Sequence, residues 1–222
     1  MSIVTVLGGG SFGTALATLF AQVGHDEVRL WSHDPEQVKT INATRHNPKY
    51  LSEYELHSAI VAHADIREAL NGTGKVVVAI PSQVLRGVLV EVADGFPEVP
   101  VILGSKGIEN DTLMTLDEVV QDVLGEGWEQ RTLALSGPSF AKEIMKGDPT
   151  AVVLASQNIE LADELSAAIC VGQFRAYSSS DIVGVELGGA LKNVMAIACG
   201  MTMGAGLGES ARAALITRGF TE

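Results

Sequence analysis

The chain has 222 residues, 46% of them hydrophobic, which is enough apolar material for one large or two modest folded domains. Its formal net charge is −12, and no run of Lys or Arg forms a basic stripe, so nucleic acid and anionic membranes are poor candidate partners. We find neither a signal-peptide pattern nor a run of about 18 uninterrupted apolar residues, and expect no membrane span. Cys170 and Cys199 lack disulfide or metal-type spacing. We therefore expect free core thiols, no metal and a cytoplasmic location.

Short β-branched runs alternate with helix-length amphipathic segments along most of the chain. The predicted strands cover residues 2–8, 27–31, 75–81, 99–105, 131–137, 150–156 and 173–179. Runs this apolar on both faces, separated by helical patterns, indicate a parallel or mostly parallel sheet covered on two sides. The sequence therefore predicts an α/β fold of the Rossmann type.

The first predicted strand leads into a glycine-rich turn and then a helix. Gly8, Gly10 and Gly13 fit the spacing G-x-G-x-x-G. The first glycine permits a tight turn, the second lets the backbone approach a pyrophosphate, and the third allows close packing of helix on strand. Because the motif lies in the required strand-to-helix context, we predict a dinucleotide site here, with NADP or NAD as the cofactor.

The second predicted strand ends in Trp31-Ser32-His33-Asp34, where an acidic residue usually binds the ribose 2′-hydroxyl. A serine and a histidine could accept a 2′-phosphate instead. Asp34 precedes Pro35, so a helix N-cap is the safer interpretation of its carboxylate. NADP(H) use is therefore compatible with the sequence.

Two loops follow later strands, at the edge where open α/β sheets bind ligands. Lys106 lies in the first of these, between a serine and a glycine, and either contacts a ligand or is a solvated surface lysine. The second, Ser136-Gly-Pro-Ser-Phe140, offers backbone N–H groups and Ser139 to a ligand. Alternatively, Pro138 simply begins a helix that Ser136 caps.

The pattern changes near residue 179. We predict an NAD(P)-binding domain over residues 1–179, followed by the start of an all-α domain over 180–222. In this second part a long apolar helix, a glycine-rich loop over 203–210 and a second helical segment follow one another. The helical pattern has no stop signal at Glu222, which indicates a fragment whose helices leave apolar faces uncovered.

Lys192 stands in the middle of the long apolar helix, where a charged ammonium is costly to bury. Gly188 and Gly184 lie one and two turns before it on a shared face, so a backbone or a ligand could approach closely. We expect a half-buried lysine beside the cofactor cleft, with a pKa lowered by burial, which would protonate a carbonyl oxygen while hydride reaches the carbon. The alternative is a lysine that snorkels to solvent.

Several motifs, in this order, closely resemble those of bacterial-type NAD(P)-dependent glycerol-3-phosphate dehydrogenases. They cover residues 8–17, 47–52, 80–86, 105–109, 136–156, 184–200 and 211–219. The resemblance implies interconversion of sn-glycerol 3-phosphate and dihydroxyacetone phosphate, which supplies the backbone of phospholipids. It also implies that Lys192 is the catalytic proton donor and acceptor.

The resemblance further assigns ligand contacts. Cofactor-contacting positions are Ser11, Phe12, His33, Tyr50, Lys106 and Ala141. Substrate-contacting positions are Lys106, Gly137, Ser139 and Lys192. Phe12 and Ser210 depart from the family, which usually has Trp or Tyr and Asn there, and family members continue beyond Glu222 into helices that complete the site.

Rival interpretations stay open at this point. One is a related 3-hydroxyacid dehydrogenase or ketopantoate-type reductase, which the loops around Lys106 and Ser139 disfavour because they suit a phosphorylated triose. Another is a fragment that binds NAD(P)H without catalysis. The sequence also leaves open whether a second copy of the chain completes a homodimer.

Overall fold

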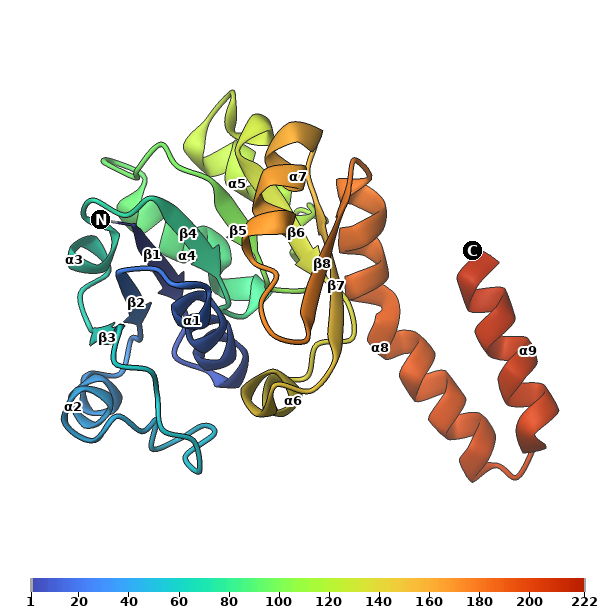
Figure 1. Ribbon diagram of the computed structural model, residues 1–222. Coiled ribbons are helices and arrows are strands. Elements are labelled where there is room, and N and C mark those ends of the chain that lie inside the picture. The colour runs from blue at the N-terminus through green and yellow to red at the C-terminus, as the bar shows by residue number, and fades with distance from the viewer. Residues whose placement is uncertain (1, 222) are drawn as a thin grey trace.

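The computed structural model describes residues 2–221, arranged as a large twisted sheet between helices and a helical hairpin beside it (Figure 1). The strands are Ile3–Leu7 (β1), Glu27–Trp31 (β2), Ile60–His63 (β3), Lys75–Val78 (β4), Val101–Leu103 (β5), Thr132–Ser136 (β6), Thr150–Ala155 (β7) and Phe174–Ser179 (β8). The helices are Ser11–Val23 (α1), Pro35–Thr44 (α2), Ile66–Leu70 (α3), Ser82–Val92 (α4), Leu116–Leu124 (α5), the 3₁₀ turn Trp128–Gln130 (η1), Ala141–Lys146 (α6), Ile159–Ala168 (α7), Ile182–Gly204 (α8) and Gly208–Thr221 (α9).

The strands form one sheet in the order β3-β2-β1-β4-β5-β6-β7-β8. Every neighbouring pair is parallel except β6 and β7, which run antiparallel. The prediction of a mostly parallel, Rossmann-type sheet is therefore confirmed. The strand order reverses between β1 and β4, which makes their carboxyl ends a switch point where such sheets bind ligands.

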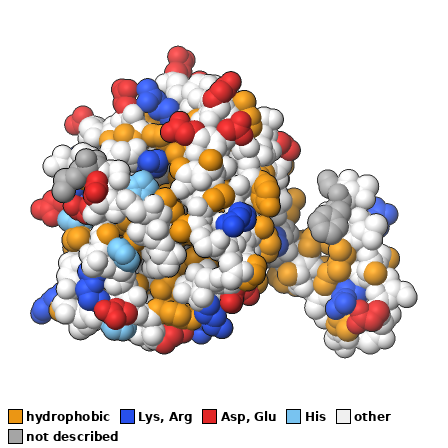
Figure 2. All heavy atoms as spheres, in the orientation of Figure 1, with side chains coloured by type: hydrophobic (Ala, Val, Ile, Leu, Met, Phe, Trp, Pro, Cys, Tyr) orange, Lys and Arg blue, Asp and Glu red, His pale blue; other side chains and the backbone are white. Residues whose placement is uncertain are grey.

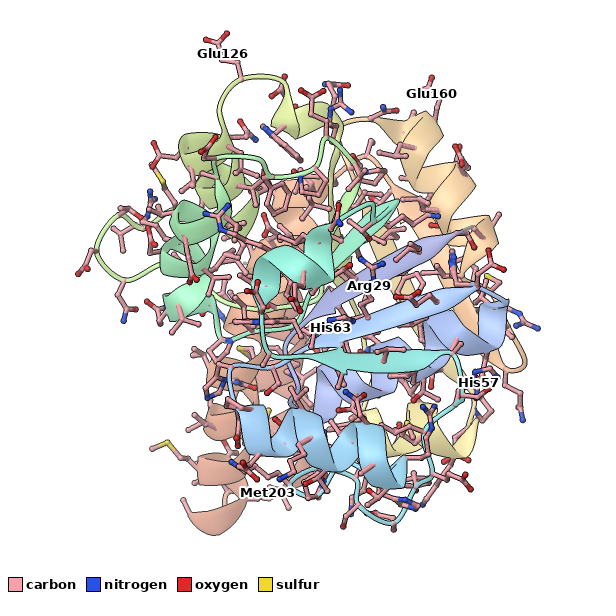
Figure 3. The ribbon with its side chains drawn as sticks, turned by 90° about the vertical axis from the view of Figure 1, so that its left-hand side faces the viewer. Arg29, His57, His63, Glu126, Glu160 and Met203 are labelled. Carbon is pink, nitrogen blue, oxygen red and sulfur yellow. The ribbon has the colours of Figure 1, made fainter. Side chains whose placement is uncertain are left out.

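Strand β3 was not among the predicted strands. It is a short edge strand whose residues alternate between buried and exposed positions, so it lacks the continuous apolar run that marked the others. Arg29 of β2 ties the neighbouring helix α3 to the sheet, since its guanidinium donates to the carbonyl oxygens of Glu68, Ala69 and Asn71. Figure 3 shows Arg29 close to His63 of β3 at this edge of the sheet.

Helices cover both faces of the sheet, as the two-sided apolar strands predicted. Alternate residues of a strand point to opposite faces, so Val77 joins one hydrophobic cluster while Val76 and Val78 join the other. The first cluster is completed by side chains from α1, α2, α6 and α7, including Phe20, Ile41, Ile144 and Leu165. The second is completed by α3, α4 and α5, including Leu70, Leu85, Leu89 and Val119.

Helices α8 and α9 form a hairpin that projects from the sheet beyond β7 (Figure 1). Asp181 caps α8, because its side chain accepts a hydrogen bond of 2.8 Å from the backbone N–H of Gly184. The helices reach further into the predicted glycine-rich loop than expected, leaving only residues 205–207 between them. Figure 2 shows apolar side chains on the projecting part.

The expected uncovered apolar faces are present on this hairpin. Large side chains that are exposed include Leu191, Val194, Ile197, Met201, Met203 and Leu207. By length and composition alone, α8 would also pass as a membrane-spanning helix, although the core helices of globular proteins meet the same criterion. The two cysteines are free thiols, but both are half-buried and not part of the core.

Candidate functional site

The glycine turn between β1 and α1 has the geometry that its spacing predicts. Gly8 has φ +128°, a conformation that favours glycine, and a Cβ on it would overlap the carbonyl oxygen of Ala79 at the end of β4. A Cβ on Gly13 would overlap the carbonyl oxygen of Gly8. The first and third glycines therefore allow α1 to pack tightly against the switch point.

Gly10 differs from the other two glycines, because a Cβ there would meet no atom within 4 Å. It is also the N-cap of α1, and no side chain caps the helix. The first residues of α1, Ser11 and Phe12, border open space without a side-chain cap, and a helix N-terminus of this kind favours an anionic ligand.

A groove of about 450 Å³ lies in front of this turn. Predicted site residues Gly8, Gly10, Ser11, Phe12, His33 and Tyr50 all line it, together with Ser32, Asp34, Lys49 and Pro81. A second hollow of about 350 Å³ continues it along the sheet edge, lined by Ser11, Phe12, Ala79, Gly104, Lys106, Ser139 and Ala141. Ser11 and Phe12 line both hollows, so the two form one continuous groove, and of the predicted cofactor positions only the buried Gly13 does not line it.

The end of β2 differs in part from the expectation. Asp34 is the N-cap of α2, as predicted: its Oδ1 accepts from the backbone N–H groups of Glu36 and Gln37. Ser32 is only 2% exposed, and its hydroxyl donates to Gln37 Oε1 at 2.6 Å. Ser32 therefore does not face the groove as a free donor, whereas His33 is exposed there.

Lys49 supplies a cation that the sequence interpretation missed. It lines the groove and forms an ion pair with Asp34, which lowers the pKa of that carboxyl through a hydrogen bond and raises the pKa of the Lys49 ammonium. A carboxylate that is paired and caps a helix repels a nearby phosphate less than a free one. The 47–52 motif was the signal that could have indicated Lys49.

Asn47 and Gln37 form a buried amide network behind the groove, which the sequence interpretation also missed. Both donate to the carbonyl oxygen of Gly9, at 3.0 Å and 2.7 Å. The side-chain oxygen of Asn47 in turn accepts from the backbone N–H groups of Lys49 and Tyr50. The network therefore holds the segment that carries Lys49 and Tyr50 against the glycine turn.

Lys106 follows β5, at the junction of the groove and the first turns of α8. Its ammonium lies 5.9 Å from the centre of the Phe12 ring and donates to the carbonyl oxygen of Gly137 at 3.2 Å. Burial lowers the pKa of Lys106, and the positive charge of Lys192 lowers it further. The structure thus brings Lys106, Phe12 and Gly137 together, and it places Lys106 inside the groove rather than on an open surface.

The loop that carries Lys106 is anchored on α4. Arg86 forms a bidentate ion pair with Glu109, with the closest N–O distance at 3.0 Å, and a second ion pair with Asp122 of α5. Gln83 adds hydrogen bonds to the backbone of Ile108 and Asn110. Arg86 and Glu109 belong to motifs that the sequence resemblance singled out, but no role was assigned to them.

The loop after β6 does not support the capping alternative. Helix α6 begins at Ala141 with Phe140 as its N-cap and no side-chain cap, so neither Ser136 nor Pro138 has the predicted position in the helix. Gly137 has φ +147°, and a Cβ there would lie 2.8 Å from the carbonyl oxygen of Ala151. Ser139 lines the groove, and its hydroxyl donates to Gly137 O at 3.3 Å.

Lys192 lies near the groove, since its positive charge lowers the pKa of Lys106. The expectation that Lys192 is half-buried is wrong in the part of the chain that the structure describes. It is exposed, because α8 leaves the sheet edge at this point and the helix packs on the sheet only through its first turns. The predicted approach of a ligand to the face of Gly184 and Gly188 stays a prediction. A Cβ on Gly188 would meet nothing, whereas one on Gly189 would lie 3.0 Å from Ser136 Oγ and 3.5 Å from Lys106 Cγ.

A mostly parallel sheet, an uncapped helix after a glycine turn and a groove across the switch point define a Rossmann-type nucleotide-binding protein. Sequence comparison gives the family. The profile of the NAD-dependent glycerol-3-phosphate dehydrogenase N-terminus matches residues 3–162, and that of the C-terminus matches residues 181–222. The chain therefore belongs to the NAD-dependent glycerol-3-phosphate dehydrogenase family.

Individual relatives agree with the family assignment. The chain is 47% identical over 220 residues to the glycerol-3-phosphate dehydrogenase [NAD(P)+] of Mesorhizobium japonicum and 46% identical over 219 residues to that of Myxococcus xanthus. A crystal structure of the Coxiella burnetii glycerol-3-phosphate dehydrogenase superposes with a TM-score of 0.89 at 36% identity, covering 99% of this chain and 66% of that one. The two sequence matches cover 99% and 98% of this chain but only 63% and 65% of the relatives, so the chain spans less than two thirds of their length.

Proposed function

We propose that the chain carries the coenzyme site and the proton donor of an sn-glycerol-3-phosphate dehydrogenase. The reaction transfers hydride between NAD(P)H and dihydroxyacetone phosphate and supplies glycerol 3-phosphate for phospholipid synthesis. The observation that carries the proposal is one groove that begins at the uncapped N-terminus of α1 and ends at Lys106, beside Lys192. The relatives' names include this activity.

The groove fits a nicotinamide dinucleotide, which supplies the hydride when bound. Gly10 leaves room for the pyrophosphate, and the first N–H groups of α1 can donate to it. The adenosine ribose would lie towards His33, Lys49 and Tyr50, and the nicotinamide end towards the second hollow, where Phe12 and Ala141 line the wall.

The substrate end combines two lysines with different surroundings. The ammonium of Lys106, with Ser139 and the backbone of Gly137, would bind the phosphorylated triose at the sheet edge. Lys192 would hold the proton that the carbonyl oxygen receives as hydride reaches the carbon, and it would take that proton back in the reverse direction.

Substitution of Lys192 tests the proposal. The variant is made in the protein at its native length, which mass spectrometry of the protein from its own cells establishes. Lys192→Met keeps the apolar stem and removes the proton. We expect kcat for reduction of dihydroxyacetone phosphate to fall about 100-fold or more, while NADPH affinity in calorimetry stays unchanged. The matched control is Lys39→Met, at an exposed position of α2. Near-normal turnover of folded Lys192→Met would assign the proton to another group.

Direct titration tests the coenzyme preference. We propose that NADP(H) binds at least as well as NAD(H), because His33 and Lys49 line the groove and the charge of Asp34 is paired. A hundredfold preference for NADH would refute this proposal. The cytoplasmic location, the domain division at residue 179 and a homodimer stay predictions, and sedimentation measures the last of these.

A second candidate function is NAD(P)H binding without turnover. It is favoured by one observation, the exposure of Lys192 on a helix whose apolar face is uncovered. Tight NADPH binding with no oxidation in the presence of dihydroxyacetone phosphate, at every chain length found in the cell, would select it.

A further inference from the structure

Glu186 is a buried acid at the point where α8 leaves the sheet, and the proposed reaction does not use it. Its side chain is among the few on α8 that are buried, with 8% of the residue exposed. It points at the N-terminus of α5, where the backbone N–H of Leu116 donates to Glu186 Oε1 at 3.1 Å. A contact between residues 70 positions apart in the chain thus joins α8 to α5.

The Glu186 carboxyl also lies beside another acid. Asp117 lies within hydrogen-bonding reach and is itself only 3% exposed. Oε2 of Glu186 is buried and, as an ionised oxygen, has no hydrogen-bond partner among the described residues. Asp117 is fixed from the other side, since Thr115 Oγ1 donates to its Oδ1 at 2.5 Å.

Two buried carboxyls in contact satisfy each other only when one of them carries a proton. Burial, and after it the neighbouring Asp117 carboxyl, raises the pKa of Glu186 to about 9, with the backbone N–H groups of Asp117 and Leu116 opposing this only in part. A protonated Glu186 can accept from Leu116 and donate to Asp117 at once, which leaves no buried oxygen unpaired.

The position of Glu186 bears on both lysines. Glu186, Val185 and Gly189 of α8 border a small space of about 10 Å³ that Lys106 and Ser136 border from the sheet side. Gly189 packs directly over the Lys106 side chain. Lys192 follows Gly189 by three residues, so the depth at which α8 lies sets the place of Lys106 and the distance between the two ammonium groups.

We propose that Glu186 is a positioning residue that joins α8 to α5 in its uncharged form, through Leu116 and Asp117, and thereby places Lys106 and Lys192 at the groove. We call the contacts of Glu186 with Leu116 and Asp117 the joint. The existence of the joint depends only on these contacts, whereas its effect on turnover rests on the proposed function. The charged groups that face it are Asp117 from α5, with Glu118 beside it held by Thr115, and Lys106 from the loop after β5. Lys192 lies further along α8 itself.

Hydrogen exchange in the full chain tests the joint without any enzymatic assay. Glu186→Gln keeps both hydrogen bonds in an uncharged form, since the amide accepts from Leu116 and donates to Asp117. Glu186→Ala removes both, and Glu186→Asp keeps an ionisable group but shortens the side chain. Glu160→Ala, at an exposed glutamate of α7 (Figure 3), is the matched control.

At pH 7 we expect Glu186→Gln and the control to keep the exchange protection of residues 116–124 and 182–190 within about twofold of the wild type. We expect Glu186→Ala and Glu186→Asp to lose about tenfold or more of this protection.

Where turnover is measurable, Glu186→Ala should lower kcat and leave the KM for NADPH unchanged, and Glu186→Gln should restore kcat. Unchanged protection in Glu186→Ala or Glu186→Asp would overturn the proposal. So would a loss of protection in Glu186→Gln equal to that in Glu186→Ala. If Glu186→Ala and Glu186→Asp lose protection while the wild-type protein shows no turnover, the joint is supported and the proposed activity is rejected.

Discussion

The sheet edge and the α8–α9 hairpin differ in which side chains they bury: polar side chains are buried at the edge, whereas apolar side chains are exposed on the hairpin. At the edge, Ser32, Gln37 and Asn47 are buried and satisfied by hydrogen bonds from neighbouring elements. On the hairpin, Ile197 is 64% exposed and Met201 is 70% exposed. The groove is therefore lined by residues of the sheet edge, whereas α8 packs on the sheet through its first turns, where Ile182 and Glu186 are its buried residues.

The same difference separates the two lysines of the proposed site. Lys106 is half-buried, packed by Phe12 and Gly189, and its pKa is lowered by that burial. Lys192 has the same chemistry but stands where α8 has left the sheet. Residue type and proximity to the groove thus do not determine the environment of an ammonium, because desolvation comes from the elements packed over it.

The largest effect is expected from truncating a buried side chain of the sheet domain, compared with truncating an exposed side chain of the hairpin. Phe20 of α1 is fully buried, so Phe20→Ala should lower the free energy of unfolding by about 3–5 kcal/mol in urea denaturation. Ile197→Ala should stay within about 0.5 kcal/mol of the wild type. A cost for Ile197→Ala close to that for Phe20→Ala would show that the hairpin is buried in solution and remove the contrast.

A smaller effect on stability is expected at the glycine turn, where substitutions of Gly13 and Gly10 should have different consequences. Gly13→Ala should destabilise the fold by about 1–3 kcal/mol, because its Cβ would overlap Gly8 O. Gly10→Ala should unfold like the wild type, since its Cβ meets open space, and Gly10→Val should bind NADPH more weakly in calorimetry. Unchanged NADPH binding by folded Gly10→Val would place the pyrophosphate elsewhere.

The pH dependence of stability probes the junction of the two regions. Because the pKa of Glu186 is raised from 4.5 to about 9 in the folded chain, the unfolded state releases its proton first as pH rises. Its contribution to stability is fully present below the unfolded pKa and is lost as pH rises towards the folded one. The slope should not exceed about 1.4 kcal/mol per pH unit, the limit for one proton.

Thermal unfolding between these pH values checks this dependence. The fall in stability should be shallower in Glu186→Gln than in the wild type, because the amide does not titrate. Equal slopes in the two proteins would show that Glu186 is already ionised in the folded state.

The smallest effect concerns the outer wall of the groove. Lys49→Ala should weaken NADPH binding by about threefold to tenfold and NADH binding less, since an exposed cation interacts only modestly with a phosphate. Lys39→Ala, on an exposed position of α2 outside the groove, is the control. An equal loss for both coenzymes would remove Lys49 from the recognition of the 2′-phosphate.

The residue pattern predicts the strands with continuous apolar runs, the glycine turn and the Asp34 cap, because each of these features depends on a few neighbouring residues. It missed β3, whose alternating edge pattern carries a weaker signal. It also missed Lys49 and the anchoring role of Arg86, since their partners lie 15 and 23 positions away in the chain.

Tertiary packing, and not the residue pattern, sets which glycine of α8 packs on the sheet, the exposure of Lys192 and the contact of Glu186 with Asp117. Helical spacing fixes which residues share a face, but not which face turns towards the sheet or where the helix leaves it. Burial, and with it the pKa of Lys106 and of Glu186, depends on elements that are distant in sequence and packed together in space.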